Sequence, residues 1–298
     1  MSHPSLAVVL GVTSVVGRHL CRRLSAAGFT GECVSRQPEP IGGPPSGFIW
    51  RRLDVRAPGD WAAPAGSVVF SLLPLWMLPD CLPRLATARQ IVAVGTTSVF
   101  AKAASADPRE AELAGRIAAA ERRLGEVLRD SDCAWTVLRP TLIYDPGLDR
   151  NVSAIARFIA RFGFFPVVPP ATGLRQPIHA DDVAQAALAA VDNREARNRA
   201  FDLPGGEMLP YREMVRRIFD GLGRRPVILP LPVGLLRLGL AAARPVYGRR
   251  YSPALFDRMN RDLAFDGTAA RLALGIEPRP FRPVFPGRRP RRGSPPMV

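Results

Sequence analysis

The segment Leu6–Leu20 (LAVVLGVTSVVGRHL) constrains the fold more than any other part of the chain. It begins with a short apolar run, continues with a turn that has a glycine at each end, and then starts an amphipathic stretch. The pattern predicts a strand at Leu6–Leu10, a tight turn that starts at Gly11, and a helix over Val15–Ala27.

Strand-like and helical patterns then alternate through the first half of the chain. Short apolar runs predict further strands at Glu32–Ser35, Gly47–Trp50, Ser67–Leu72, Ile91–Val94 and Trp135–Leu138. A long helix is expected over Asp107–Arg129, with Asp107 as its N-cap and Pro108 in its first turn. Continuous apolar strands separated by helices indicate an α/β fold, namely a doubly wound parallel (Rossmann) sheet with a smaller C-terminal α/β cap.

The pattern changes after Pro140, so we divide the chain into three parts. Residues 1–150 are expected to form a nucleotide-binding domain that also receives strands from later segments. Residues 151–280 are expected to form a smaller substrate or cap region that is interleaved with it. Residues 281–298 form a basic tail rich in proline and arginine, which we expect to be disordered. The cap should lie over the carboxyl edge of the sheet, where ligands bind in such folds.

The glycine turn has the composition of a phosphate-binding loop. Gly11 suits a tight turn, Gly17 suits close packing of the helix, and backbone N–H groups at the start of the helix can bind a pyrophosphate. Ser14 replaces the expected middle glycine; it narrows the approach to the phosphates but offers a hydroxyl. The alternative is an ordinary connection between strand and helix. The predicted cofactor-binding residues from the turn and the strand ends are Gly11, Thr13, Ser14, Val15, Val16, Gly17, Leu72, Pro74, Thr96 and Pro140.

The end of the second predicted strand bears on which nucleotide is bound. An acidic residue at this position accepts a hydrogen bond from the free ribose 2′-hydroxyl of NAD. This chain has Ser35 and Arg36 there, and an arginine suits a 2′-phosphate. We therefore predict that NADP(H) is favoured over NAD(H), with Arg36 on the phosphate. Asp54, after the third strand, is predicted to meet the adenine amino group; otherwise it is a turn residue.

Four later segments carry a family resemblance. They are VGTTSVF (94–100), WTVLRPTLIYDPG (135–147), QPIHADDVA (176–184) and NRDLAFD (260–266). Together with the glycine turn they resemble the extended and atypical branches of the short-chain dehydrogenase/reductase superfamily, the NAD(P)-dependent epimerase/dehydratase relatives. The resemblance implies a nicotinamide cofactor, a small-molecule substrate, and a protein that is a monomer or a homodimer.

The resemblance fails at the family's catalytic pair, Tyr-x-x-x-Lys. The corresponding positions on the long helix are Leu113 and Ile117, neither of which can transfer a proton. No tyrosine has a lysine four residues later, and Lys102 is the only lysine of the chain. Thr96 matches the family's Ser/Thr on the fifth strand and can hold a substrate oxygen. We take Thr96 and Tyr144 as the candidate catalytic residues, with His179 and Asp145 as further possible proton donors.

Composition excludes several other classes. The net charge is +15, but the basic residues are spread along the chain and no nucleic-acid-binding module is evident, so we predict no nucleic acid partner. The four scattered cysteines lack metal or redox spacing; we predict reduced thiols, no metal, and a cytoplasmic protein. No apolar run is long enough to span a membrane. The apolar stretch 229–250 is either a buried cap helix or a peripheral membrane contact.

Two functions therefore stay open. The first is an NADP(H)-binding oxidoreductase or epimerase-like enzyme with a non-standard acid/base group. It would act on a small carbonyl, hydroxyl or nucleotide-sugar substrate. The second is a catalytically inactive NAD(P)-binding scaffold or sensor.

Overall fold

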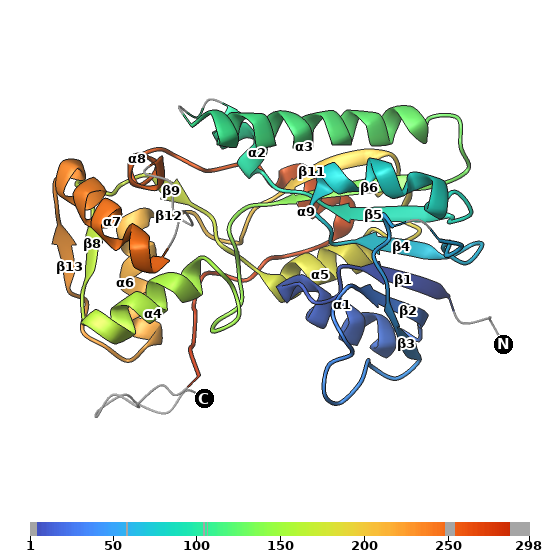
Figure 1. The fold of residues 1–298 in the computed structure, drawn as a ribbon, viewed down its shortest axis with the longest axis horizontal. Coiled ribbons are helices and arrows are strands. Elements are labelled where there is room, and N and C mark those ends of the chain that lie inside the picture. The colour runs from blue at the N-terminus through green and yellow to red at the C-terminus, as the bar shows by residue number, and fades with distance from the viewer. Residues whose placement is uncertain (1–4, 58, 104, 106, 248–253, 287–298) are drawn as a thin grey trace.

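A central sheet of seven parallel strands forms the larger part of the molecule (Figure 1). The computed structural model describes residues 5–57, 59–103, 105, 107–247 and 254–286. The strand order in space is β11-β6-β5-β4-β1-β2-β3. The strands are β1 (Leu6–Leu10), β2 (Thr30–Ser35), β3 (Phe48–Arg52), β4 (Val68–Ser71), β5 (Gln90–Val94), β6 (Ala134–Pro140) and β11 (Arg199–Leu203).

Helices cover both faces of this sheet, as the continuous apolar strands predict. In β1, Ala7 and Val9 belong to one core, while Val8 and Leu10 belong to another on the opposite face. The first core is completed by α1 (Val15–Ala26), α5 (Ala180–Ala189) and α9 (Thr268–Leu274), with the short turn η3 (Arg194–Ala196) beside them. The second is completed by α3 (Pro108–Val127) with the turns η1 (Leu75–Met77) and η2 (Pro79–Leu85), next to the short helix α2 (Ser98–Ala103). The doubly wound α/β fold is confirmed.

The last strand of the sheet and one of its covering helices come from the second half of the chain. β11 pairs in parallel with β6, with Phe201 opposite Leu138. Helix α5 packs against α1 rather than in the cap, because its small side chains, among them Ala180, Ala184 and Ala187, are almost wholly buried and allow close approach. β11 is thus a strand that the sheet domain receives from a later segment, and α5 joins the same domain although it lies within residues 151–280.

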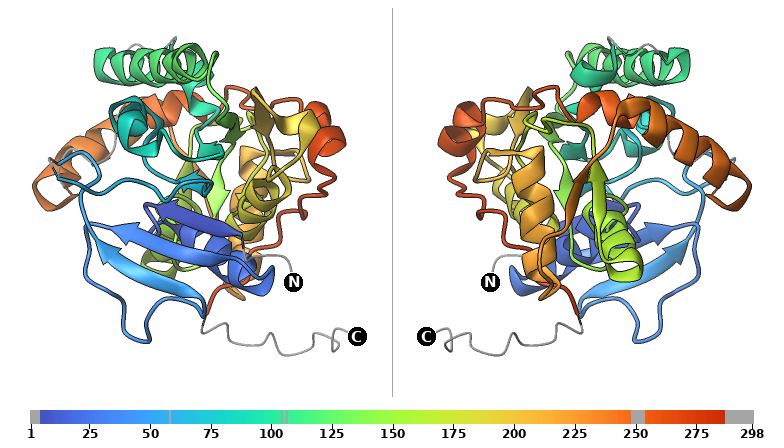
Figure 2. Two further views of the ribbon diagram at one scale, coloured as in Figure 1. Left: turned by 90° about the vertical axis from the view of Figure 1, so that its right-hand side faces the viewer. Right: turned by 90° about the vertical axis from the view of Figure 1, so that its left-hand side faces the viewer.

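The remaining elements form a smaller cap at one end of the sheet (Figures 1 and 2). Its helices are α4 (Val152–Phe162), α6 (Tyr211–Gly221), α7 (Val233–Tyr247) and α8 (Ala254–Arg258). Three two-stranded pairs accompany them: β7 (Ile143–Tyr144) with β10 (Ile178–His179), β9 (Leu174–Arg175) with β12 (Leu209–Pro210), and β8 (Phe165–Val167) with β13 (Ile228–Pro230). Their apolar side chains, including Ile159, Ile218 and Phe219, form a third core.

The start of the expected tail is part of the fold. Phe281 is fully buried and Phe285 is 5% exposed, and both belong to the core of the cap. Burial of each aromatic ring stabilises this segment by about 2 kcal/mol. The high proline and arginine content of the segment hides this contribution from an assessment based on composition. Residues 287–298 of the expected disordered tail lie outside the described residues.

Asp181 links three elements through a cluster of charges. It accepts hydrogen bonds from Arg23 of α1 at 2.7 and 2.8 Å and from Arg279 of the C-terminal segment at 2.7 Å. It does not cap its own helix; the N-cap of α5 is His179, whose Nδ1 accepts from the Asp181 N–H. The hydrogen bonds from Arg23 hold the pKa of Asp181 well below its usual range.

Asp181→Asn is expected to lower the free energy of unfolding by about 1–2 kcal/mol at pH 7, because two arginines lose an ionised partner. The folded-state pKa of Asp181 is depressed, so its contribution is complete above the unfolded-state pKa of about 4 and is lost as the pH falls below it. Urea unfolding at pH 7 and pH 3 should show the difference between wild type and variant shrinking at pH 3. Asp257→Asn is the control, because its ion pair with Arg237 is half exposed. An equal loss in both variants would contradict the prediction.

Candidate functional site

The turn between β1 and α1 has the close backbone packing that the glycine pattern predicts. Gly11 adopts a left-handed φ of +76°, and its N–H donates to Val34 O of β2. A Cβ on Gly11 would lie 3.2 Å from the backbone of Leu72. A Cβ on Gly17 would lie 2.2 Å from Val12 O, which no side chain can tolerate without a backbone shift. Both glycines are therefore required by the geometry of the turn.

Ser14 is the N-cap of α1. Its Oγ accepts a hydrogen bond from the Gly17 N–H at 3.1 Å. The N–H groups of Val15 and Val16 are among the first donors of the helix, which by position have no acceptor inside it. The start of α1 thus presents backbone donors and the positive end of the helix dipole at the carboxyl edge of the sheet.

Other predicted site residues meet the glycine turn at this edge. Leu72 donates its N–H to Leu10 O at the end of β4, and the exposed Pro74 follows it. At the ends of β5 and β6, Thr97 donates both its N–H and its hydroxyl to Pro140 O. Thr96 precedes Thr97 and is partly exposed. The parallel register therefore brings the predicted residues to one edge, as the fold requires.

A second hydroxyl accompanies Thr96 that the sequence patterns did not single out. Thr96 Oγ1 donates to Ser98 Oγ at 3.0 Å and also accepts from the Ser98 N–H at 3.1 Å. Both hydrogen bonds span two residues at the start of α2, so a hydroxyl residue two positions after Thr96 is the signal that could have found it.

Helix α3 has apolar side chains at Leu113 and Ile117, the two positions that the family resemblance assigns to a tyrosine and a lysine. Ile117 is 7% exposed and Leu113 is half-buried; both pack in the core between α3 and the sheet. The neighbouring Arg116 stacks on the ring of Trp76, with its guanidinium carbon 4.1 Å from the ring centroid. Glu121 pairs with Arg139 of β6. These contacts account for the side chains of this helix without a proton-transfer role.

Tyr144 lies in the core of the cap. Its ring is 2% exposed and makes edge-on contacts with His179 and Phe281, and burial raises its pKa to about 12. A buried phenol with a raised pKa is a poor proton donor to a bound ligand, so we do not carry Tyr144 into the proposed catalytic set. Its predicted catalytic role stays untested.

The other two predicted proton donors also have structural partners. The ring of His179 caps α5, and burial, reinforced by the charge of Arg279, lowers the His179 pKa. Asp145 accepts from His19 Nε2 of α1 at 2.9 Å. The sequence patterns missed His19 because its partner is 126 residues away.

At the outer end of the edge, arginines surround the ends of β2 and β3. Arg36 is exposed, and its carbonyl accepts from Arg52 Nε at 3.3 Å. Asp54 accepts hydrogen bonds from the backbone and side chain of Arg56, and the backbone hydrogen bond lowers the Asp54 pKa. The charge of Arg36 lowers the pKa of Asp54 further.

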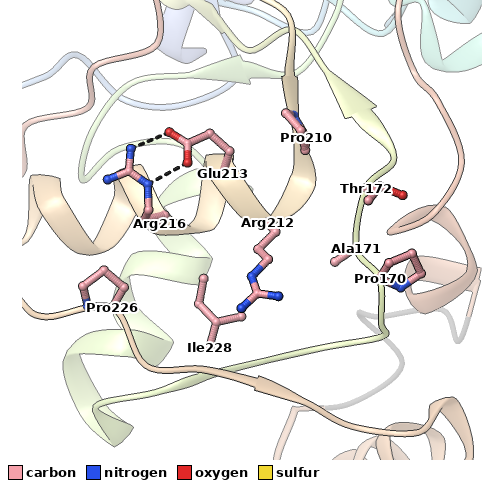
Figure 3. A pocket seen from close by; sticks show the side chains of 9 residues that line it. All are labelled: Pro170, Ala171, Thr172, Pro210, Arg212, Glu213, Arg216, Pro226 and Ile228. Carbon is pink, nitrogen blue, oxygen red and sulfur yellow. Dashed lines mark hydrogen bonds and ion pairs between the residues drawn. The ribbon is translucent and has the colours of Figure 1, made fainter.

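Two cavities lie away from the glycine turn. One of about 420 Å³ is formed by the cap alone, between α6, β13 and the segment 170–172 (Figure 3). There Arg212 extends toward Ile228, while Arg216 is held by Glu213. The other, of about 640 Å³, lies beside Tyr144, His179 and Pro286. Neither includes the predicted nucleotide-binding residues, so we base the candidate site on the backbone geometry of the sheet edge.

Two contacts connect the cap to the sheet domain near α2, the helix that follows Thr96. Arg258 of α8 donates to both carboxylate oxygens of Glu110 of α3, at 2.8 and 2.9 Å. The rings of Phe100 and Phe265 lie 5.9 Å apart between α2 and the segment after α8. These contacts bring cap residues next to the helix that follows Thr96.

Arg175 of β9 is a buried cation held by backbone carbonyls. Its side chain donates to the carbonyl oxygens of Leu174, Arg258 and Arg261, and the residue is 5% exposed. Burial lowers its pKa to about 10, so it stays charged at neutral pH. Arg175 therefore fixes the end of α8 and the residues after it.

No protein-family model matches the chain. Curated relatives nevertheless exist. A (4-alkanoyl-5-oxo-2,5-dihydrofuran-3-yl)methyl phosphate reductase of Streptomyces griseus is 26% identical over 293 residues, covering 93% of this chain and 95% of the reductase. A UDP-glucose 4-epimerase of Vibrio cholerae is 23% identical over 160 residues, covering 53% of this chain but only 46% of the epimerase.

The solved structures agree with this fold. UDP-glucuronic acid 4-epimerase from Bacillus cereus, solved in complex with NAD, superimposes with a TM-score of 0.66 at 13% identity, covering 93% of this chain and 92% of that one. The seven-stranded parallel sheet and this superposition establish a Rossmann-like α/β fold for the chain. These relatives and this solved structure are epimerases and a reductase, in agreement with the resemblance that the sequence motifs carry.

Among the described groups of His, Cys, Asp and Glu, none is arranged to hold a metal ion. Within the described part of the chain, no helix has both the length and the apolarity needed to cross a membrane.

Proposed function

We propose that the chain binds NADP(H) along the carboxyl edge of its sheet. We further propose that it acts as an oxidoreductase or epimerase-like enzyme on a small carbonyl, hydroxyl or nucleotide-sugar substrate. The observation that carries the proposal is the backbone cradle of Gly11 and Gly17. A side chain at either position would collide with neighbouring backbone, at Leu72 or at Val12. With glycine at both positions, the first N–H groups of α1 can donate to a diphosphate.

The residues present fit a dinucleotide at each point of the edge. Val15 and Val16 N–H groups would hold the pyrophosphate, and Ser14, whose Oγ already accepts from Gly17, keeps its hydroxyl proton for a phosphate oxygen. Leu72, Pro74 and Pro140 would line the path toward Thr96. The nicotinamide ring supplies hydride transfer when it is bound there.

The proposed preference for NADP(H) rests on charge. Arg36 is exposed at the end of β2, where the ribose of the adenosine is bound in this fold, and Arg52 lies beside it. A guanidinium forms charge-assisted hydrogen bonds with a phosphate that it cannot form with a bare hydroxyl. Asp54 would then accept from the adenine amino group.

Arg36→Ala is expected to raise the dissociation constant for NADPH about tenfold or more, since a hydrogen bond to a charged group contributes about 1.5–3 kcal/mol. The affinity for NADH should not change. Isothermal titration of the purified protein with each nucleotide measures both. Arg22→Ala is the matched control, because Arg22 is an exposed arginine of α1 whose side chain donates to the carbonyl of Arg18. A stronger affinity for NADH than for NADPH in the wild type would overturn the assignment.

The hydroxyl pair is the proposed substitute for the missing tyrosine and lysine. Thr96 would hold the substrate oxygen, and Ser98, hydrogen-bonded to Thr96 at 3.0 Å, would exchange a proton with it. The contacts between cap and α3 would exclude water from this end of the edge.

Thr96→Val and Ser98→Ala are each expected to lower kcat by about a hundredfold, a typical contribution of one acid/base group, and to leave the affinity for NADPH unchanged. The assay follows NADPH absorbance in a screen of carbonyl compounds and, separately, the interconversion of UDP-sugars. Thr97→Val is the control, because its hydroxyl donates to Pro140 O inside the fold. Loss of activity in the Thr97 variant alone would contradict the proposed roles.

The second candidate function is a catalytically inactive scaffold or sensor that binds NAD(P). It is favoured by the apolar Leu113 and Ile117 on α3. Tight nucleotide binding with no turnover in either screen would decide for it. Absence of binding to both nucleotides at millimolar concentration would reject both functions.

The cellular setting remains a proposal. We propose a cytoplasmic monomer or homodimer without nucleic acid partners. Helix α7 exposes Leu235 (57%) and Leu238 (67%), and we propose peripheral contact with a membrane as a second use of this helix. Residues 248–250 of the predicted apolar stretch lie outside the described residues. Flotation with anionic vesicles tests this contact, and retention of the protein in the bottom fraction would reject it.

A further inference from the structure

Two cysteines that are apart in the sequence touch each other beneath the nucleotide turn. Cys21 on α1 and Cys33 on β2 have their sulfur atoms 3.4 Å apart, and one thiol donates a hydrogen bond to the other. Both residues are buried, with 2% and 0% of their surface exposed. They are twelve positions apart in the sequence, so no motif spacing identifies the pair.

We propose that Cys21 and Cys33 are a redox-sensitive site that a peroxide converts into an intrachain disulfide. The disulfide would fasten α1 to β2 within the unit that forms the glycine turn. A sulfur–sulfur bond is about 2.05 Å long, so the two atoms must approach by somewhat more than 1 Å. Such a movement is within the reach of side-chain rotation and a small helix shift.

The reaction proceeds in two steps. The Cys33 thiolate attacks one oxygen of hydrogen peroxide; an S–O bond forms, the O–O bond breaks, and the departing hydroxide takes up the Cys21 proton as water. The Cys21 thiolate left by the first step then attacks the sulfur of the Cys33 sulfenic acid; the S–S bond forms, the S–O bond breaks, and the departing hydroxide takes up the proton that Cys33 lost on ionisation, giving a second water. Two thiols lose two electrons in total, and the peroxide gains them.

The hydrogen bond between the thiols distinguishes their reactivity. Donation from Cys21 lowers the pKa of Cys33, whereas the same contact raises the pKa of Cys21. The thiolate is the form that reacts with peroxides, so Cys33 reacts first. Both sulfurs are buried, so the reaction waits for local opening of α1 and is slow compared with that of an exposed thiol.

The other two cysteines serve as internal controls. Cys81 and Cys133 are also buried, but each sulfur contacts a backbone carbonyl, of Met77 and Ala134 respectively, instead of a second sulfur. Burial raises the pKa of each to about 11. Cys81 and Cys133 should therefore remain reduced while the Cys21–Cys33 pair oxidises.

Peptide mapping of the full-length protein tests the proposal. The reduced protein is treated with hydrogen peroxide, alkylated, and digested with trypsin without reductant. Cys21 and Cys33 fall in different peptides, 19–22 and 24–36, while Cys81 and Cys133 fall in 57–84 and 130–150. The expected product is the joined pair 19–22 with 24–36, two hydrogen atoms lighter than the sum, which dithiothreitol separates. It should form about tenfold faster than any modification of Cys81 or Cys133.

Variants test the order of reaction. Cys21→Ser should leave a sulfenic acid on Cys33 that dimedone traps, and Cys33→Ser should leave Cys21 unlabelled. If a serine variant fails to fold, the alanine variant at the same position replaces it, and the mapping of the wild type needs no variant at all. An exposed model thiol in the same reaction shows when oxidation is complete. The proposal is overturned if Cys21 and Cys33 are still found alkylated at that time, or if a disulfide forms between any other two cysteines.

Discussion

Gly17→Ala is expected to abolish tight nucleotide binding and to lower the free energy of unfolding by about 3 kcal/mol. The new Cβ would lie 2.2 Å from Val12 O, and both atoms belong to the turn that connects β1 to α1. Relief requires the backbone to move, because no flexible side chain can yield, and overpacking of this kind costs about 1–3 kcal/mol or more. The same movement misplaces the N–H donors of Val15 and Val16. Loss of one or two hydrogen bonds to a phosphate corresponds to about a tenfold to hundredfold weaker affinity.

Gly115→Ala provides a matched control. Gly115 is also a helical glycine, in α3, but a Cβ there meets no atom within 4 Å. Alanine is the better helix former by about 1 kcal/mol, so this variant should be slightly more stable than the wild type and bind nucleotide normally. Urea unfolding and NADPH titration of both variants give the comparison. Normal binding by the Gly17 variant would show that the glycine turn is not the phosphate site.

Arg175→Met is expected to cause the second large effect, a loss of about 3 kcal/mol in the free energy of unfolding of the cap. Methionine keeps most of the volume but removes the hydrogen bonds from the guanidinium to three carbonyl oxygens, those of Leu174, Arg258 and Arg261. Leu174 O and Arg258 O still accept from the backbone N–H groups of Leu263 and Arg261, whereas Arg261 O loses its donor from Arg175. A hydrogen bond from a charged group contributes about 1.5–3 kcal/mol, and removal of a buried cation offsets part of the sum.

The location of the damage distinguishes this prediction from general destabilisation. Hydrogen exchange should accelerate in residues 258–263 first, since Arg175 holds that segment, and exchange in β1 and β4 should stay slow. Arg237→Met is the control, because Arg237 pairs with Asp257 at an exposed site. Uniform acceleration across the sheet and the cap would contradict the role given to Arg175.

Local patterns predicted most of the sheet because their causes are local. Leu6–Leu10 is apolar throughout, and Asp107 caps α3 as the sequence indicates, accepting from the Arg109 N–H. The sequence predicts that position 17 needs a glycine for close packing of the helix. In the structure a Cβ at this position would lie 2.2 Å from Val12 O. The parallel order of the strands then brought Leu72, Thr96 and Pro140 to the same edge as the turn.

Features that depend on distant pairs could not be predicted in this way. Cys21 meets Cys33, and Asp145 meets His19, only because α1 packs against particular neighbours. Phe281 was assigned to a disordered tail because the segment around it is rich in proline and arginine, a composition that predicts disorder even when an aromatic residue is present. Ser98 was missed for a different reason: its partner Thr96 is only two residues away, but the sequence patterns pointed to the two threonines and not to the hydroxyl that follows them.

The position of β11 has a consequence for how the chain is made. During synthesis the ribosome releases the first six strands of the sheet, then α4, α5 and the short strands between them, and only then the strand that covers the outer side of β6. Until residue 203 has emerged, β6 is an open edge that can pair with another nascent chain. Fragments that end near residue 150 should therefore aggregate, and a chaperone that shields this edge should raise the yield of the whole protein.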